Sequence, residues 1–484
     1  MARKRILTAV SLSLLTPLMA QTNPKPEPAP AVAAKPAASY PPPAAPKDAA
    51  ALGRGIQRTM TLLATSTPKK RNHVRILFYG QSITEQDWSK RVSDDLRRRF
   101  PHADLTIENR AIGGFASQLL INPAEHDLYP FYPDLVIFHV YGANDKYEEI
   151  IKNIRSRTTA EVLMQKDHVA AAGVADNPDP EKDKGLWWDG MMNNRFLPEI
   201  AKKYGCGLVD VRSGWLDYLK ANHLEPKALL VDGVHLNDHG NYLMAELVKR
   251  YLVYRPDLAK AEAAAGNDLV RTFAVGKDVK WQNGRLTLPF DGNRVDVVAS
   301  ADRDAKAPSV AAARVLVDGK APSLFPEMYR ITRPTPNPWS PLALTRVDHA
   351  KPLVAEDWTL EITLVAPDST RWSYTVAGSV TGPDGGGASD APFVSTSGRV
   401  RIEPSAFFRN PNATIPKGYQ IRWQVLPTHH DTYAPPRSSD PSREAVTTVA
   451  QGLPNGRHTL EIVAPNGKKS IPIAAIRVYR PPLR

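Results

Sequence analysis

Residues 74–84 read Val-Arg-Ile-Leu-Phe-Tyr-Gly-Gln-Ser-Ile-Thr, an apolar run that leads through a glycine to a serine. Val74 to Tyr79 form an apolar run of strand length, and Gly80 permits a tight turn after it. Ser82 then stands at the start of an expected helix, where backbone N–H groups are free. Ligands collect at the carboxyl ends of strands in open α/β sheets. Taken alone, a serine in this position is more often a helix cap than a nucleophile.

Short apolar runs alternate with longer amphipathic runs from Val74 to about Tyr254. This alternation predicts a parallel sheet covered by helices. The expected strands are Val74 to Tyr79, Leu105 to Glu108, Leu135 to Val140, Glu161 to Met164 and Gly207 to Val211. The expected helices lie at about 88–99, 145–156, 191–204 and 239–253.

Three further motifs follow in the same region. Glu108-Asn109-Arg-Ala-Ile-Gly113-Gly114-Phe follows the second strand, Gly142-Ala-Asn144-Asp145 follows the third, and Asp232-Gly-Val-His235 precedes the last helix. Together with Gly-Gln-Ser82 they resemble, in order, the four blocks of the SGNH (GDSL-like) hydrolase superfamily. The resemblance covers about 74–254 and implies a flavodoxin-like three-layer sandwich with a central parallel sheet.

The resemblance also implies a role for each motif. Ser82 would be the nucleophile and His235, backed by Asp232, its general base; the oxyanion hole would comprise the N–H groups of Ser82 and Gly114 and the side-chain amide of Asn144. Asp232 and His235 are three residues apart, so one turn of chain brings the carboxylate to the imidazole, although this pair alone is as compatible with a turn. Gly113 is an alternative to Gly114. The family usually has Asp where this chain has Gln81, which affects the nucleophile loop but removes no triad member.

Other residues of this region are less informative. Asp145 is interpreted as a structural partner or helix cap. Trp187 and Trp188 are candidates for substrate binding by stacking on sugar rings, with buried packing as the alternative. His168, His223 and His239 lack the spacing partners of a metal site, so no metal or other cofactor is expected.

The 484 residues are enough for two folded domains. We expect an export signal at 1–20, a Pro/Ala-rich linker at 21–70, the hydrolase domain at 71–258 and a β-sandwich at 268–484. The last is expected to be all-β and jelly-roll-like, with a large elaboration at about 324–445. The apolar part of the signal is shorter than the roughly 20 residues that span a bilayer, so no stable membrane insertion is expected after its removal.

The amino-acid composition limits the metal sites and binding partners that the chain can have. Cys206 is the only cysteine, so a disulfide framework and a cysteine-based zinc site within one chain are excluded, and a buried structural thiol is expected there. The net charge is +12, but the basic residues are scattered without interleaved aromatics, so nucleic acid is not an expected partner.

These observations favour a secreted or periplasmic serine esterase. Its expected substrate is acylated carbohydrate, from which it would remove acetyl groups, or another small ester. The carbohydrate part rests on the expected export, the β-sandwich and analogy with carbohydrate esterases. Two alternatives stay open: a lipase or lysophospholipase with the same triad, and a catalytically inactive glycan-binding envelope protein. The acyl group, the glycan, the oligomeric state and the role of 324–445 do not follow from the sequence.

Overall fold

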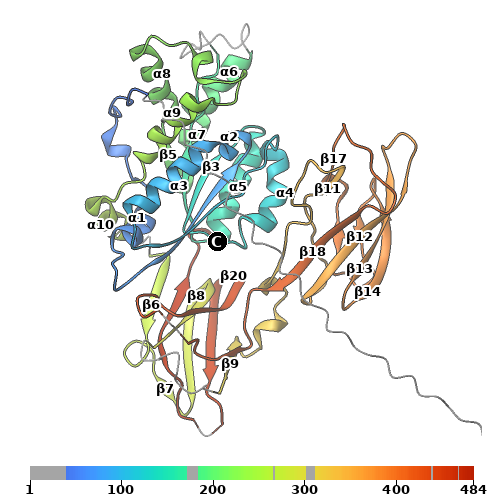
Figure 1. Cartoon of the computed structure of the whole chain (residues 1–484). Helices are drawn as coiled ribbons and strands as arrows, with labels where there is room; N and C mark the ends of the chain where they lie inside the picture. Colours follow the sequence, from blue (N-terminus) through green and yellow to red (C-terminus); the bar gives the residue numbers. More distant parts are fainter. Residues whose placement is uncertain (1–39, 172–183, 265–267, 301–310, 438–439, 467) are drawn as a thin grey trace, which may run out of the picture. The chain divides into compact units, whose positions relative to one another are not determined.

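The computed structural model describes residues 40–171, 184–264, 268–300, 311–437, 440–466 and 468–484. The expected export signal and residues 21–39 of the expected linker lie outside the described residues. Figure 1 shows the helices and strands with their labels.

A parallel five-stranded sheet of order β2-β1-β3-β4-β5 forms the centre of the first part of the chain. This is the strand order of flavodoxin-like folds. In such folds the ligand-binding site lies where the strand order reverses, which is here between β1 and β3. The strands are β1 (His73–Gly80), β2 (Asp104–Asn109), β3 (Leu135–His139), β4 (Glu161–Gln165) and β5 (Gly207–Val209).

Helices cover both faces of this sheet, because consecutive strand residues point to opposite faces and both sets are apolar (Figure 1). Ile76 and Phe78 pack in one core with α1, α3, α8 and α9, whereas Leu77 and Tyr79 pack in a second core with α4, α5 and α7. The helices are α1 (Gln57–Ala64), α2 (Ser82–Glu85), α3 (Asp87–Arg99), α4 (Ser117–Asp127), α5 (Asn144–Arg157), α6 (Lys184–Met191), the π-helical η2 (Met192–Phe196), α7 (Leu197–Tyr204), α8 (Val211–Ala221), α9 (Asp238–Lys249) and α10 (Pro256–Ala264).

Two details differ from the sequence expectations. Helix α1 lies inside the expected linker: Ile56, Met60 and Leu63 recur at helical spacing and are fully or almost fully buried in the first core. The last parallel strand ends at Val209 rather than Val211, because Asp210 caps α8 by accepting a hydrogen bond from Ser213 N.

The second part of the chain is built of antiparallel β-sheets, which confirms the expected fold class of a parallel α/β sheet followed by an all-β region. One sheet has the order β19-β9-β20-β8-β21-β6, with β7 paired to β8. Its strands are β6 (Val270–Ala274), β7 (Trp281–Gln282), β8 (Arg285–Ala299), β9 (Ala313–Val317), β19 (Thr432–Tyr433), β20 (Val446–Val463) and β21 (Ile473–Tyr479).

A further group of strands, with its own apolar core, interrupts this sheet in sequence between β9 and β19. Five of them form a sheet of order β10-β18-β12-β13-β14, and the other four pair as β11-β17 and β15-β16. They are β10 (Tyr329–Ile331), β11 (Leu342–Leu344), β12 (Glu356–Val365), β13 (Trp372–Gly378), β14 (Gly382–Ala388), β15 (Phe393–Val394), β16 (Arg401–Ile402), β17 (Phe407–Arg409) and β18 (Gln420–Pro427). We call residues 329–427 the inserted β region.

Candidate active site

Ser82 occupies the turn from β1 into α2. β1 ends at Gly80, Gln81 is the buried N-cap, and Ser82 is the first residue of the helix. An added Cβ at Gly80 would overlap the backbone oxygen of His139 on the neighbouring strand β3, so only glycine fits there. The close approach of two strands thus fixes the position from which Ser82 projects.

The structure brings Ser82, His235 and Asp232 together. The Ser82 Oγ lies 2.9 Å from His235 Nε2, and His235 Nδ1 lies 2.8 Å from Asp232 Oδ2. Asp232 Oδ1 also accepts the backbone N–H groups of Val234 and His235, both at 2.7 Å. This arrangement can activate a hydroxyl for attack on an ester.

The charge on Asp232 decides the tautomer of the imidazole. The backbone N–H and then the ring of His235, with the N–H of Val234, lower the pKa of Asp232 to about 2. The carboxylate is therefore ionised at neutral pH and accepts a hydrogen bond from the N–H at Nδ1 of His235. That leaves the lone pair of Nε2 to accept the Ser82 hydroxyl proton. The side chains of His235 and Asp232 are 39% and 54% exposed, so both groups are accessible from solvent.

Two neighbouring side chains hold the His235 loop. Gln86 donates from Nε2 to Leu236 O and accepts from Leu236 N, both at 3.1 Å, which ties this loop to the residue that caps α3. His168 Nε2 lies 2.8 Å from Val234 O. Burial lowers the pKa of His168 to about 4, so its ring is neutral and donates this bond. Neither residue was expected in this role from the sequence.

The expected oxyanion donors follow β2 and β3. Gly114 has a φ of +78°, which favours glycine, whereas Gly113 is not in that region. Gly113 N donates to Glu85 Oε1 at 2.7 Å, so its N–H is already bound. This occupancy favours Gly114 over Gly113 as the free donor. Asn144 begins α5, and its Oδ1 is buried without a hydrogen-bond partner among the described residues.

Asn109 of the second motif has a structural contact. Its Nδ2 donates to Thr84 O at 2.7 Å and to Ser89 Oγ at 2.9 Å, and its Oδ1 accepts from Ala111 N. The loop that carries Gly114 is thereby tied to the helices that follow Ser82.

The two candidate substrate tryptophans lie on α6 and differ in environment. Trp188 is partly buried against the second core, as the packing alternative expects, whereas Trp187 is 43% exposed. A different tryptophan contacts the site: Trp339 of the inserted β region donates from Nε1 to Gly113 O at 3.0 Å.

Within the described ranges, no group of three or more His, Cys, Asp or Glu side chains is placed to hold a metal ion. None of the helices in the described ranges has both the length and the apolarity that crossing a membrane requires.

A family model for the GDSL-like lipase/acylhydrolase family matches residues 78–243, a range that contains Ser82, Gly114, Asn144, Asp232 and His235. The chain therefore carries a GDSL-like hydrolase domain. The sequence resemblance to this superfamily is thus confirmed over these residues. A comparison with curated proteins finds no match.

Several solved structures are similar to the chain. A two-domain esterase (CEX) active on acetylated mannans is 16% identical, with 90% of this chain and 98% of that one covered and a TM-score of 0.35. The acetylxylan esterase Axe2 from Geobacillus stearothermophilus is 17% identical, with 39% and 97% covered and a TM-score of 0.33. A putative GDSL-like lipase from Parabacteroides merdae ATCC 43184 is 18% identical, with 38% and 98% covered and a TM-score of 0.32. Similarities of this size assign no substrate to this chain.

Proposed function

We propose that this chain is an exported serine esterase that uses Ser82, His235 and Asp232 to remove small acyl groups, acetyl foremost, from carbohydrate. The observation that carries the proposal is the chain of contacts from Ser82 Oγ through the imidazole to the ionised carboxylate. Ser82 Oγ attacks the ester carbonyl while its proton passes to His235 Nε2. The resulting oxyanion is bound by the N–H groups of Ser82 and Gly114 and the Asn144 amide.

The rest of the cycle uses the same groups. His235 gives its proton to the departing alcohol, which leaves an acyl group on Ser82. A water molecule then loses a proton to His235 and attacks the acyl carbon, which releases the acid and restores Ser82. Asp232 stabilises the imidazolium in both halves of the reaction.

The carbohydrate part of the proposal rests on the export signal expected at 1–20 and on an aromatic surface beside the site, since Trp339 is 45% exposed next to Gly114. Flat aromatic faces suit the stacking of sugar rings. Protein recovered from the culture medium or periplasm should begin at Gln21; retention of residues 1–20 in the cell membrane would contradict the export part.

The esterase part is tested with p-nitrophenyl acetate and a Ser82→Ala variant. We expect hydrolysis by the unmodified protein and a loss of at least about 10³-fold in kcat for the variant. Ser213→Ala is the matched control, because Ser213 is exposed on α8 and its Oγ bonds only to Asp210 among the described residues. Equal turnover by Ser82→Ala, or none by the unmodified protein, would refute the esterase proposal and favour a glycan-binding role.

A second candidate, an esterase for longer acyl chains, is favoured by two exposed apolar side chains beside His235. Val231 is 70% and Val234 41% exposed. A series of p-nitrophenyl esters from acetate to palmitate separates the candidates, together with mass spectrometry of acetylated oligosaccharides after incubation. The carbohydrate proposal expects the highest kcat/KM on acetate and loss of acetyl groups from the oligosaccharides; a rise in kcat/KM with chain length supports the alternative.

A further inference from the structure

A loop of the inserted β region reaches the loop that carries the second oxyanion donor. Trp339 lies between β10 and β11, and its Nε1 donates to Gly113 O at 3.0 Å. The two residues are 226 positions apart in sequence. The contact therefore links the inserted strands to the GDSL-like domain at the proposed site of chemistry.

This hydrogen bond acts on the peptide unit that supplies the donor. The carbonyl of Gly113 and the N–H of Gly114 belong to the same planar trans peptide, in which the two groups point in opposite directions. When Trp339 holds the carbonyl, the direction of the Gly114 N–H is set as well. An oxyanion hole works only when its donors are aimed before the charge develops.

The neighbouring contacts restrict the same loop further. The preceding peptide is held by Glu85, which accepts from Gly113 N. The Trp339 ring covers Gly114 so closely that an added Cβ would lie 2.5 Å from Cζ2 of the indole. The indole thus encloses Gly114 on its Cα side. The peptide unit before Gly113 is bound to α2, and the peptide unit after Gly113 is bound to the inserted β region.

Trp339 is itself fixed by the inserted β region. Asn410 Nδ2 donates to Trp339 O at 2.7 Å, and Trp339 N donates to Asn337 Oδ1 at 3.0 Å. The indole meets Phe408 of β17 edge-on, with centroids 5.3 Å apart. Phe408 also contacts Phe115, the residue after Gly114, at 5.0 Å. Such aromatic pairs add stability beyond the area they bury.

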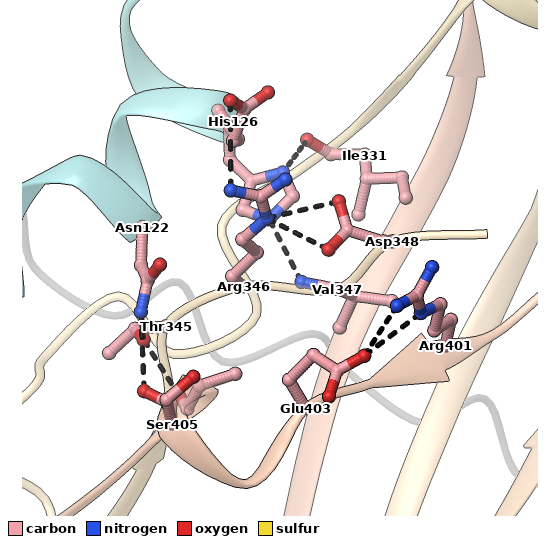
Figure 2. Close-up of polar contacts among 12 residues, drawn as sticks. Asn122, His126, Ile331, Thr345, Arg346, Val347, Asp348, Arg401, Glu403 and Ser405 are labelled. Carbon is pink, nitrogen blue, oxygen red and sulfur yellow. Dashed lines mark hydrogen bonds and ion pairs between the residues drawn. The ribbon is translucent and has the colours of Figure 1, made fainter. Parts of the chain in front are cut away.

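The same part of the inserted β region is bound to α4, which begins three residues after Gly114. Figure 2 shows Asn122 and His126 of α4 among the contacts. Asn122 Nδ2 donates to Ser405 O at 3.2 Å, while the ring of His126 bonds at 3.1 Å to Ile331 O through Nδ1 and to Val347 N through Nε2. These bonds hold the inserted strands against the helix that directly follows the loop containing Gly114.

We propose that Trp339 is a positioning residue of the esterase site: it aims the Gly114 N–H at the substrate's carbonyl oxygen, so the inserted β region is a working part of the catalytic machinery. This inference rests on the proposed function. It assigns to the inserted strands a role in the rate of the reaction as well as any role in holding glycan.

The direct test is Trp339→Phe, which keeps an aromatic ring beside Gly114 and removes the Nε1 donor. Deleting a whole oxyanion donor costs about 10²- to 10³-fold in kcat, so a donor that is present but poorly aimed should cost about 10-fold. Because the oxyanion exists only in the transition state and intermediates, KM for p-nitrophenyl acetate should stay within about twofold. The rates are normalised to folded enzyme by active-site titration.

A second variant protects the test against misfolding. Asn410→Ala releases the backbone of Trp339 without changing its ring, and we expect a smaller loss of kcat in the same direction. Leu364→Ala on β12, a side chain that is 64% exposed in the same inserted β region, is the matched control and should equal the unmodified protein.

The outcomes separate the two proposals. If Ser82→Ala is inactive but Trp339→Phe keeps its kcat, the positioning role is overturned and the esterase proposal stands. A higher KM at unchanged kcat in Trp339→Phe also overturns it, because Trp339 would then only contact substrate. If Ser82→Ala remains active, the proposed function fails and the inference falls with it.

Discussion

Gly114→Ala adds a single carbon atom at the proposed oxyanion donor, and the structure shows what that atom would meet. The φ of +78° costs an alanine about 1–2 kcal/mol relative to its preferred conformations. The new Cβ would also lie 2.5 Å from the Trp339 ring, so the loop or the indole must move. Either movement turns the Gly114 N–H away from the developing charge. Loss of this donor corresponds to about 3 kcal/mol, or about 10²-fold in kcat.

Steady-state hydrolysis of p-nitrophenyl acetate measures this loss, with the thermal midpoint recorded in parallel. Gly113→Ala should lose less, because its Cβ would meet the movable carboxylate of Glu85. Gly456→Ala on β20 is the control, since nothing lies within 4 Å of its added Cβ. A Gly114→Ala enzyme with kcat within twofold of the unmodified protein would show that the Gly114 N–H does not stabilise the oxyanion.

Three further predictions test the support of the site and of the inserted β region. Asp232→Asn should lose about 10³-fold or more in kcat with an unchanged circular dichroism spectrum, because an amide does not hold the imidazole tautomer. Gln86→Ala removes both bonds to Leu236 and should lower kcat about tenfold in the same assay with little change in KM. Burial lowers the pKa of His126 to about 4, below the usual 6.5, so the unfolded chain takes up the proton first as pH falls. The contribution of His126 to the free energy of unfolding, measured by urea titration, should therefore fall by about 3 kcal/mol between pH 6.5 and 4. The His126→Gln variant should not show this fall, and an identical pH dependence in the variant would contradict the assignment.

The parallel sheet could be predicted because its strands are apolar on both faces and each is followed by a helix or a chemical motif. Helix α4 was not expected, and its Pro123 explains why, since proline inside a helix breaks the usual pattern. The expected linker included helix α1 because we continued it beyond the Pro/Ala-rich residues that precede the helix. The apolar spacing of Ile56, Met60 and Leu63 was the available signal.

The candidate site, like the fold, could be predicted from the sequence only in part. Ser82, Asp232 and His235 carry their chemistry in short motifs at strand and helix ends, so their convergence follows from the order of the elements. Trp339 carries no such signal: it lies in a proline-rich loop more than 200 residues from Gly113, and only the tertiary contacts of the inserted β region bring them together. The structure therefore adds to the sequence analysis the residues that hold the reacting groups.

The proposed mechanism depends above all on Ser82 being a nucleophile that His235 activates. Intact mass and peptide mapping after treatment with a fluorophosphonate reagent measure this most directly, because the reagent bonds covalently to activated serines. We expect one adduct on the peptide containing Ser82, together with loss of esterase activity and much slower labelling of His235→Ala. An adduct on another residue, or full hydrolysis of p-nitrophenyl acetate by protein that takes up no label, would contradict it.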